Sequence, residues 1–234
     1  MYLTCTLLEK NFSIECLKPG PDILVNDSTR RIWIEAVAPD QGEIGLPDRV
    51  PDLIYGVVMN YPEEQIILRY RAAIQEKHDN KYKGYIARNI VGDHDAFVIA
   101  VNSSKLSFAW PHGSIIPEII KAVFPVGDPQ LEIDRKSHAV LGRSFQYRSS
   151  IKKNSGNSVP TDIFLNPDYK GITGILFSHV SVTRSPEAIG SDFVFVHNPL
   201  ARNPLPEGCF NFGAEYTTQD HGATYDLTKI DHKC

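Results

Sequence analysis

Apolar and polar side chains in the first hundred residues alternate with the periods of a β-hairpin, a long helix and a buried strand. Residues 22–26 and 31–37 are rich in apolar and β-branched side chains, and the residues between them are turn-forming, so a hairpin is predicted. The long helix begins at Pro62, which suits a first helical turn, and runs to about Arg88. The unbroken apolar run at residues 96–101 is typical of a central strand that is buried on both faces.

Three further segments complete the order of elements in this half of the chain. Residues 2–10 predict a short helix, and residues 12–17 alternate as a first strand does. Residues 38–61 are punctuated by proline and glycine and are predicted to be an extended loop. The resulting order is helix, three strands, helix, strand, and the predicted fold class is α/β.

The second half of the chain has weaker patterns. Residues 117–123 predict a short helix, and residues 172–177 and 193–196 predict two strands that extend the sheet. The segment 143–160 is polar and rich in Ser, Asn and Lys, and it is interpreted as a mobile loop. From about residue 203 the chain is rich in Pro and Gly and is predicted to be mostly irregular.

The predicted hairpin brings two acidic residues face to face. If its turn is centred between Ser28 and Thr29, opposed residues have numbers that sum to 57, and Asp22 faces Glu35 on one side of the sheet. Two carboxylates that close repel each other unless a proton or a cation lies between them. A solvated pair at a strand end is the simpler alternative. Glu35 lies within the apolar run 32–37, however, where an unpaired charge is costly, and this favours a functional site.

The spacing of these acids resembles the core motif of the PD-(D/E)XK nuclease superfamily, which has the restriction-endonuclease-like fold. That motif is Pro-Asp, a hairpin, and then Asp or Glu, any residue and Lys. Asp22 matches the first acid and Glu35 the second, whereas Val37 occupies the place of the lysine. The stretch GPDILVNDSTRRIWIEAVAPDQG also resembles bacterial proteins with a GPD…WIEAVAP signature that are assigned to this superfamily. The resemblance is strongest over residues 19–102.

The resemblance implies a division of the chain. A restriction-endonuclease-like core (helix, three strands, helix, strand) would occupy about residues 1–102. A C-terminal extension of additional strands and irregular loops would follow over about residues 103–234. A chain of 234 residues with 42% hydrophobic content can bury one sizeable core, so a single domain over residues 1–234 is expected.

The long helix offers a candidate for the missing lysine. Ile66, Tyr70, Ile74 and Lys77 fall at spacings that share one face of an α-helix, so Lys77 lies on or beside the stripe that packs on the sheet. In some members of the superfamily a lysine from this helix replaces the motif lysine, and the resemblance implies this role for Lys77. A lysine that buries its stem and keeps its ammonium in water is the alternative.

The chemistry that these residues permit is metal-assisted hydrolysis of phosphodiester bonds. Asp22, Glu35 and the carbonyl of Ala36 are hard oxygen ligands that suit Mg²⁺ or Mn²⁺, and a bound metal lowers the pKa of its water. Gln65 and Arg69 lie one turn apart on an adjacent flank of the helix, where they could contact a phosphate. DNA is the expected substrate, RNA is the less favoured one, and a homodimer is compatible with this prediction.

Composition and charge limit the expected binding surface and the expected location in the cell. The formal net charge of −4 argues against a broadly basic nucleic-acid-binding surface, although local basic patches remain compatible with it. No apolar run approaches the roughly 18 residues of a membrane span, so no membrane association is expected. The N-terminus lacks the features of a signal peptide, and the four cysteines form no Cys-x-x-Cys pair. A cytoplasmic protein with reduced thiols is therefore predicted.

Two further motifs and two further classes of function stay open. His197-Asn198-Pro199 follows a predicted strand and is more typical of a turn fixed by hydrogen bonds than of an acid or base. Asp93-His94-Asp95 is interpreted as the polar loop before the strand at residues 96–101. The alternatives to a nuclease are an inactive nuclease-like fold that acts as a binding or accessory subunit, and a sheet-based interaction domain with structural acids.

Overall fold

One mixed sheet of eight strands runs through the described part of the chain. The computed structural model describes residues 1–27, 30–108, 115–222 and 224–232, and the strand order within them is β1-β2-β3-β4-β9-β10-β11-β12. The strands of this sheet are β1 (Ser13–Glu15), β2 (Ile23–Asp27), β3 (Arg30–Val37), β4 (Ala96–Asn102), β9 (Gly174–Ser178), β10 (Val194–His197), β11 (Ala214–Asp220) and β12 (Tyr225–Asp231). Two small hairpins pair outside it: β5 (Val126–Ile133) with β6 (Val140–Tyr147), and β7 (Ser150–Lys152) with β8 (Ser158–Pro160). The predicted α/β class is confirmed.

Helices are few in the described residues. They are α1 (Tyr2–Glu9), α2 (Glu63–Glu76), the π-helical η1 (Lys77–Tyr82), α3 (Lys83–Ala87), α4 (Glu118–Lys121), and the 3-10 turns η2 (Ile163–Leu165) and η3 (Pro167–Tyr169). Because α2, η1 and α3 follow one another without a gap, the predicted long helix is confirmed. The observed order of α1, three strands, the long helix and β4 is also the predicted one.

The hairpin of β2 and β3 has the register that was predicted from the sequence. Ile23 opposes Ile34 and Asp27 opposes Arg30, so the numbers of opposed residues sum to 57. The turn residues Ser28 and Thr29 themselves lie outside the described residues. Extending this register by one pair places Asp22 opposite Glu35.

Strands β3, β4 and β9 lie side by side and run parallel, so their carboxyl ends meet at one edge of the sheet. Val37 of β3 opposes Val101 of β4, and Asn102 opposes Ser178 of β9. The long helix connects β3 to β4, as parallel neighbours require a crossover. Six of the seven residues of β4 are buried, which agrees with its continuous apolar sequence.

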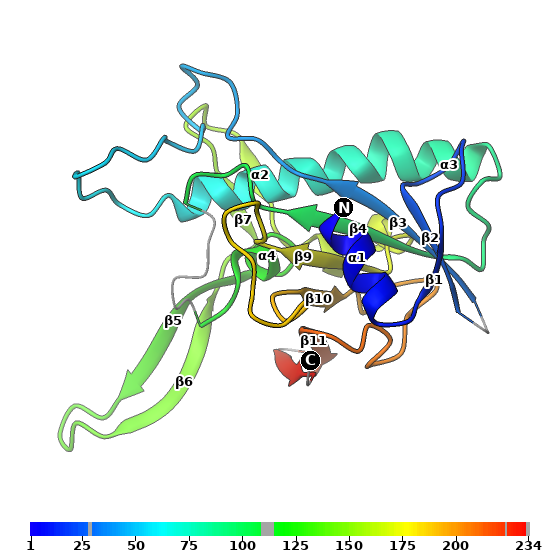
Figure 1. Cartoon of the computed structure of the whole chain (residues 1–234). Coiled ribbons are helices and arrows are strands. Elements are labelled where there is room, and N and C mark those ends of the chain that lie inside the picture. Colours follow the sequence, from blue (N-terminus) through cyan, green and yellow to red (C-terminus); the bar gives the residue numbers. More distant parts are fainter. Residues whose placement is uncertain (28–29, 109–114, 223, 233–234) are drawn as a thin grey trace.

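Helices α2 and α1 lie on opposite faces of this sheet (Figure 1). Ile66 and Ile74 of α2 are fully buried in one apolar cluster, which includes Trp33 of β3. Leu7 of α1 is fully buried in a second cluster, which includes Ile34 of β3. Since side chains alternate along a strand, the odd-numbered residues of β3 face α2 and the even-numbered residues face α1.

Two predictions for the second half of the chain are wrong. Residues 143–160, interpreted as a mobile loop, contain part of β6 and all of β7 and β8. The chain after residue 203 contains β11 and β12, an antiparallel pair at one edge of the sheet. Strands β6 and β12 are almost wholly exposed, and even apolar side chains such as Val140 and Leu141 face solvent. These strands are defined by backbone hydrogen bonds to a neighbouring strand and not by a buried apolar face. Their sequences therefore lack the alternation of apolar and polar residues that predicts a strand.

None of the helices in the described ranges has both the length and the apolar character needed to cross a bilayer. Cys5, Cys16 and Cys209 are free cysteines in the described residues. Cys234 lies outside the described residues.

Candidate functional site

Glu35 is a buried carboxylate near the carboxyl end of β3. Its side chain faces the long helix, and only 4% of the residue is exposed. The ammonium of Lys77 lies 3.1 Å from Oε1, and the hydroxyl of Tyr85 donates to Oε2 at 3.1 Å. These two partners offset the cost of burying the charge. The expected approach of the Lys77 ammonium to Glu35 is therefore present, while its role in catalysis stays a prediction.

Lys77 keeps its positive charge at neutral pH. Burial lowers the pKa of Lys77, but the hydrogen bond and the charge of Glu35 raise the pKa by more, with a smaller contribution from Glu76, and the net shift is upward. An ammonium with a raised pKa is a poor general base, because an effective base has a pKa near the working pH. Lys77 is therefore suited to offset negative charge and to orient a bound group.

Tyr85 is a neutral hydrogen-bond donor at the same carboxylate. Burial, followed by the nearby charge of Glu35, raises the pKa of Tyr85 to about 12. Its hydroxyl also lies 3.2 Å from the carbonyl of Gly20, which ties the helix to the Gly-Pro-Asp segment. Sequence reasoning missed Tyr85, because it searched this helix only for a lysine. Lys77 begins the π-helical segment and Tyr85 lies in α3, and both contact the same carboxylate.

Asp22 is an exposed residue immediately before β2. Its Oδ2 accepts a hydrogen bond of 2.8 Å from the backbone N–H of Ala36, the residue after Glu35. The charge of Asp22 also contributes to the raised pKa of Tyr85, so Asp22 lies within electrostatic reach of the Glu35 cluster. Asp22 is therefore hydrogen-bonded to the backbone of Ala36, next to Glu35 in β3, while Lys77 contacts Glu35. That the two carboxylates share a cation stays a prediction.

Pro21 explains why the carbonyl of Ala36 is available. Extending the hairpin register by two pairs beyond Ile23 and Ile34 places Pro21 opposite Ala36. The N–H of Ala36 points toward β2, where it meets Asp22, and in a strand the carbonyl of the same residue points to the same side. A proline has no N–H, so it cannot donate to that carbonyl. Within the described hairpin, the ladder therefore leaves the Ala36 carbonyl free for another partner.

A hollow of about 560 Å³ opens beside these groups on the side of α1. Its walls include Asp22 and Ala36 together with residues from α1, the ends of β3 and β4, and β9. A ligand that enters this hollow can reach the carboxyl edge of β3 without displacing the helix that carries Lys77. The hollow thus provides access to Asp22 and Ala36, whereas Glu35 is not among its lining residues and contacts the long helix.

The donor set fits a hard divalent cation that keeps several waters. Two carboxylates and one free carbonyl are the ligands that Mg²⁺ prefers, and Mg²⁺ is usually held by only one or two protein carboxylates. Among the described residues no group of three His, Cys, Asp or Glu side chains is placed to hold a metal. A metal at this edge would have Asp22, Glu35 and the Ala36 carbonyl as its protein ligands, and water would supply the others.

The two residues predicted to bind phosphate lie apart from these acids. Arg69 donates to the carbonyl and the carboxylate of Asp40, at 2.7 and 2.6 Å, so it fixes the loop after β3. Gln65 is half-buried one turn earlier on α2. Within the described contacts, neither side chain bonds to Asp22 or Glu35. Arg69 is occupied by a structural ion pair, which is a role that its spacing in the sequence could not reveal.

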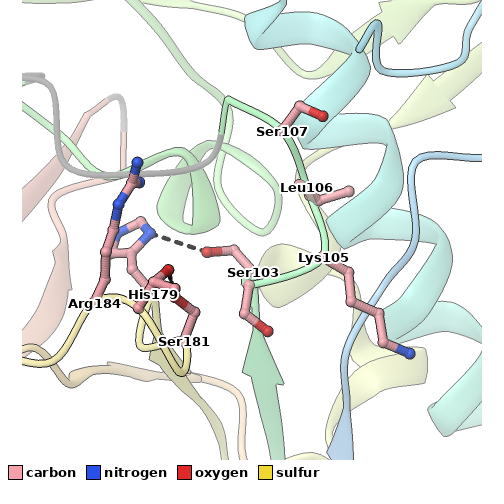
Figure 2. Close-up of a pocket in the computed structure, with 9 residues that line it drawn as sticks. Ser103, Lys105, Leu106, Ser107, His179, Ser181 and Arg184 are labelled. Atoms are coloured by element: carbon pink, nitrogen blue, oxygen red, sulfur yellow. Dashed lines mark hydrogen bonds between the residues drawn. The ribbon is translucent and has the colours of Figure 1, made fainter. Parts of the chain in front are cut away.

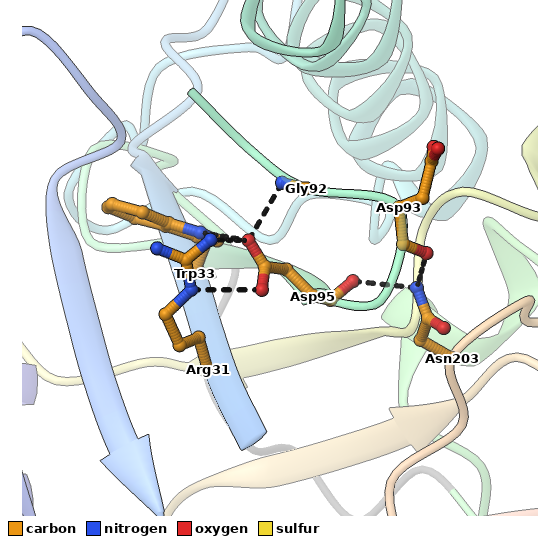
Figure 3. A network of polar contacts seen from close by, with 6 residues as sticks. All are labelled: Arg31, Trp33, Gly92, Asp93, Asp95 and Asn203. Atoms are coloured by element: carbon orange, nitrogen blue, oxygen red, sulfur yellow. Dashed lines mark hydrogen bonds and ion pairs between the residues drawn. The ribbon is translucent and has the colours of Figure 1, made fainter. Parts of the chain in front are cut away.

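Asp95 belongs to a structural network at the other end of the strands (Figure 3). Its carboxylate accepts two hydrogen bonds from Arg31, one from the indole of Trp33 and one from the N–H of Gly92. Burial raises the pKa of Asp95, but these hydrogen bonds lower it by more, so the net pKa is below its usual value. The interpretation of Asp93-His94-Asp95 as the loop before β4 is confirmed.

The His197-Asn198-Pro199 motif contains a turn-fixing residue and a histidine with a buried partner. Asn198 donates to the carbonyls of Tyr169 and Ile172, which supports the turn interpretation. His197 Nε2 lies 3.0 Å from Glu215, a fully buried carboxylate in β11. Sequence reasoning missed Glu215 because the segment that contains it was predicted to be irregular.

Comparisons with known proteins give no further assignment. No family model, no curated protein and no solved structure matches this chain. The residues and their geometry are therefore the basis of the functional proposals that follow.

Proposed function

We propose that this protein is a metal-dependent nuclease that hydrolyses phosphodiester bonds of DNA. The observation that supports this most directly is the position of the Lys77 ammonium, 3.1 Å from Glu35. Glu35 lies two residues before Val37, which occupies the place of the motif lysine. Asp22 at the Ala36 N–H supplies the second acid beside it. An acid pair, a free carbonyl and a charged lysine are the groups that such a reaction requires.

Each residue has a distinct role in this proposal. A divalent metal supplies charge stabilisation for the phosphate and a bound water of lowered pKa. Asp22, Glu35 and the Ala36 carbonyl hold that metal at the carboxyl edge of β3. Lys77 offsets negative charge that develops on the phosphate, because its raised pKa keeps it protonated. Tyr85 fixes the orientation of Glu35 through its hydrogen bond.

The proposed fold is a restriction-endonuclease-like core with a C-terminal extension. The order of α1, three strands, the long helix and β4 supports it, because this is the order of that core. Strands β9 to β12 would then be the extension, added to the same sheet. A single cytoplasmic domain, active alone or as a homodimer, belongs to the same proposal.

Exposed basic side chains on the helix that carries Lys77 support a nucleic-acid substrate. Lys81, Lys83 and Arg88 are exposed on η1, α3 and the residue after α3. Lysine and arginine on one element attract the phosphate backbone and make binding dependent on salt. DNA is the proposed substrate and RNA the alternative. A cleavage assay on both substrates at low and high salt distinguishes them.

A second candidate function is an inactive nuclease-like subunit that binds nucleic acid or protein. The observation in its favour is that both oxygens of Glu35 already have protein partners and that the residue is only 4% exposed. A carboxylate in that state could serve only to fix the long helix on the sheet. Each carboxylate oxygen has two lone pairs, however, so a metal can bind Glu35 without loss of Lys77 or Tyr85.

A cleavage assay with double-stranded DNA tests the proposal. The wild type is compared with Asp22→Asn and Glu35→Ala, with and without Mg²⁺ or Mn²⁺. Glu132→Gln, a change at an exposed acid in the hairpin of β5 and β6, is the control for loss of one negative charge. Metal-dependent cleavage that both site variants lose and the control keeps supports the nuclease. Cleavage without metal, or equal cleavage by Glu35→Ala, contradicts the mechanism, and no cleavage by the wild type favours the inactive subunit.

A further inference from the structure

A second polar hollow lies at the same edge of the sheet, beyond the ends of β4 and β9. It has a volume of about 260 Å³ and is lined by residues of two loops that follow these strands: Ser103, Ser104, Lys105, Leu106, Ser107, His179, Ser181, Thr183 and Arg184. Open α/β sheets commonly bind ligands outside the carboxyl ends of their strands. A volume slightly below that of a drug-sized pocket leaves room for one small ligand.

The lining of this hollow is suited to an anion. Five of its residues carry a hydroxyl, two carry a permanent positive charge, and none of the residues that line it is acidic. The lining is therefore positively charged, whereas the protein as a whole has a formal net charge of −4. Hydroxyl groups and an arginine fork match the oxygens of a phosphate, and hydrogen bonds to a charged group are about twice as strong as neutral ones.

Figure 2 shows how the side chains are arranged around the hollow. Ser103 is turned toward His179, and its Oγ lies 3.0 Å from Nδ1. Lys105 is turned away from both of them, so Arg184 is the permanent cation on their side. If Ser103 donates to Nδ1, the neutral ring carries its proton at Nε2 and is a donor there. Because Ser103 is fully buried, it positions His179 and is not an accessible nucleophile.

The two loops are tied together before any ligand binds. The N–H of Ser103 donates to the carbonyl of Ser178 at 3.0 Å, and the Asn102 amide donates to the carbonyl of Val180 at 3.0 Å. The hydroxyl of Ser107 is bonded to the side chain of Gln41, in the loop after β3. Donors that are held in place lose little conformational entropy on binding, so such a hollow can bind a small ligand effectively.

We propose that this hollow binds the terminal phosphate of a small ligand, such as a mononucleotide or inorganic phosphate. A terminal phosphate carries a charge of about −1.5 to −2 at neutral pH, whereas a backbone diester carries about −1. A half-open hollow with an arginine, an imidazole and several hydroxyls therefore favours the terminal group. This binding does not depend on the proposed nuclease activity, since none of the lining residues is Asp22, Glu35 or Lys77.

Titration calorimetry of the full chain with inorganic phosphate and with adenosine monophosphate tests the proposal. Arg184→Gln should weaken phosphate binding at least about tenfold, because a hydrogen bond to a charged group contributes about 1.5–3 kcal/mol. Arg135→Gln removes the same charge from the exposed tip of the hairpin of β5 and β6, and it should leave the dissociation constant unchanged. Ser181→Ala, at a half-buried position, gives a second variant that should fold and should bind more weakly.

Three results would overturn the proposal. They are the absence of phosphate binding by the wild type at millimolar concentration, equal binding by Arg184→Gln and Arg135→Gln, and preference for an oligonucleotide without a terminal phosphate over the same oligonucleotide with one. The Glu35→Gln variant separates this proposal from the nuclease. It should lose DNA cleavage and bind phosphate as the wild type does.

Discussion

The ammonium of Lys77, on the long helix, lies 3.1 Å from the carboxylate of Glu35, on the central strand β3. The side chains of both residues are largely buried, with exposures of 13% and 6%. This ion pair joins the helix to the sheet at the edge where Asp22 and Ala36 also lie. The pair is therefore expected to contribute both to stability and to the proposed chemistry, and the two contributions can be measured separately.

Replacing Lys77 by methionine tests the contribution to stability. Lys77→Met leaves Glu35 with Tyr85 as its remaining partner, and breaking a buried ion pair in this way costs about 3 kcal/mol. Lys81→Met removes an exposed lysine from the same helix and should change the free energy of unfolding by less than about 0.5 kcal/mol. Urea denaturation of the two variants measures the difference. Equal stability would mean that the pair is too well solvated to matter.

Replacing Tyr85 by phenylalanine tests the hydrogen bond to Glu35 through its pH dependence. The folded-state pKa of Tyr85 is raised to about 12, above its ordinary value of 10.0. Between these two values the folded protein keeps the tyrosine proton and the unfolded chain has lost it, so stability falls as the pH rises. The wild type should therefore lose stability between about pH 10 and 12 more steeply than Tyr85→Phe. Parallel stability curves for the two proteins would contradict this assignment.

Replacing Asp95 by asparagine tests the network at the amino ends of β3 and β4. The folded-state pKa of Asp95 is lowered, so its contribution to stability is full above its ordinary pKa of 3.8 and is lost as the pH falls. Asp95→Asn should cost about 1.5–3 kcal/mol at pH 7, since it weakens charged hydrogen bonds from Arg31 and Trp33. Urea denaturation midpoints of the wild type and Asp95→Asn should differ less at pH 3 than at pH 7. A difference that does not change with pH would contradict the ionic account.

The hairpin of β2 and β3 and the long helix could be predicted because the sequence patterns that specify them are local. The turn-forming residues fix the register that opposes Ile23 and Ile34, and the spacing from Ile66 places Lys77 on the buried face of the helix. The role of Tyr85 could not be predicted, since the sequence does not show that its hydroxyl reaches the carboxylate of Glu35.

The second hollow also could not be predicted from the sequence. Ser103 and His179 are 76 residues apart, and only the pairing of β4 with β9 brings them together. Short polar segments such as these are indistinguishable from ordinary loops until the sheet order is known. The exposed strands β6 and β12 were missed for a related reason, because their side chains face water on both sides.

A lysine at position 37, the motif position, tests whether Lys77 takes the role of the motif lysine. Val37 is half-buried two residues after Glu35, so its side chain faces the same side of the sheet. In the Lys77→Met background, Val37→Lys should restore at least about a tenth of the lost cleavage activity, since it returns a cation to the same carboxylate. Val37→Met in that background is the control of similar shape without charge. Equal activity of these two double variants would mean that the position of the cation is unimportant.

The most direct test of the account is the rate of double-stranded DNA cleavage by the wild type, Lys77→Met and Lys81→Met at saturating Mg²⁺. We expect metal-dependent cleavage by the wild type and Lys81→Met, and a rate at least about a hundredfold lower for folded Lys77→Met. Loss of a cation that stabilises developing charge costs a few kcal/mol, and each 1.36 kcal/mol corresponds to tenfold in rate. Equal rates for the two lysine variants would contradict the proposal that Lys77 replaces the motif lysine.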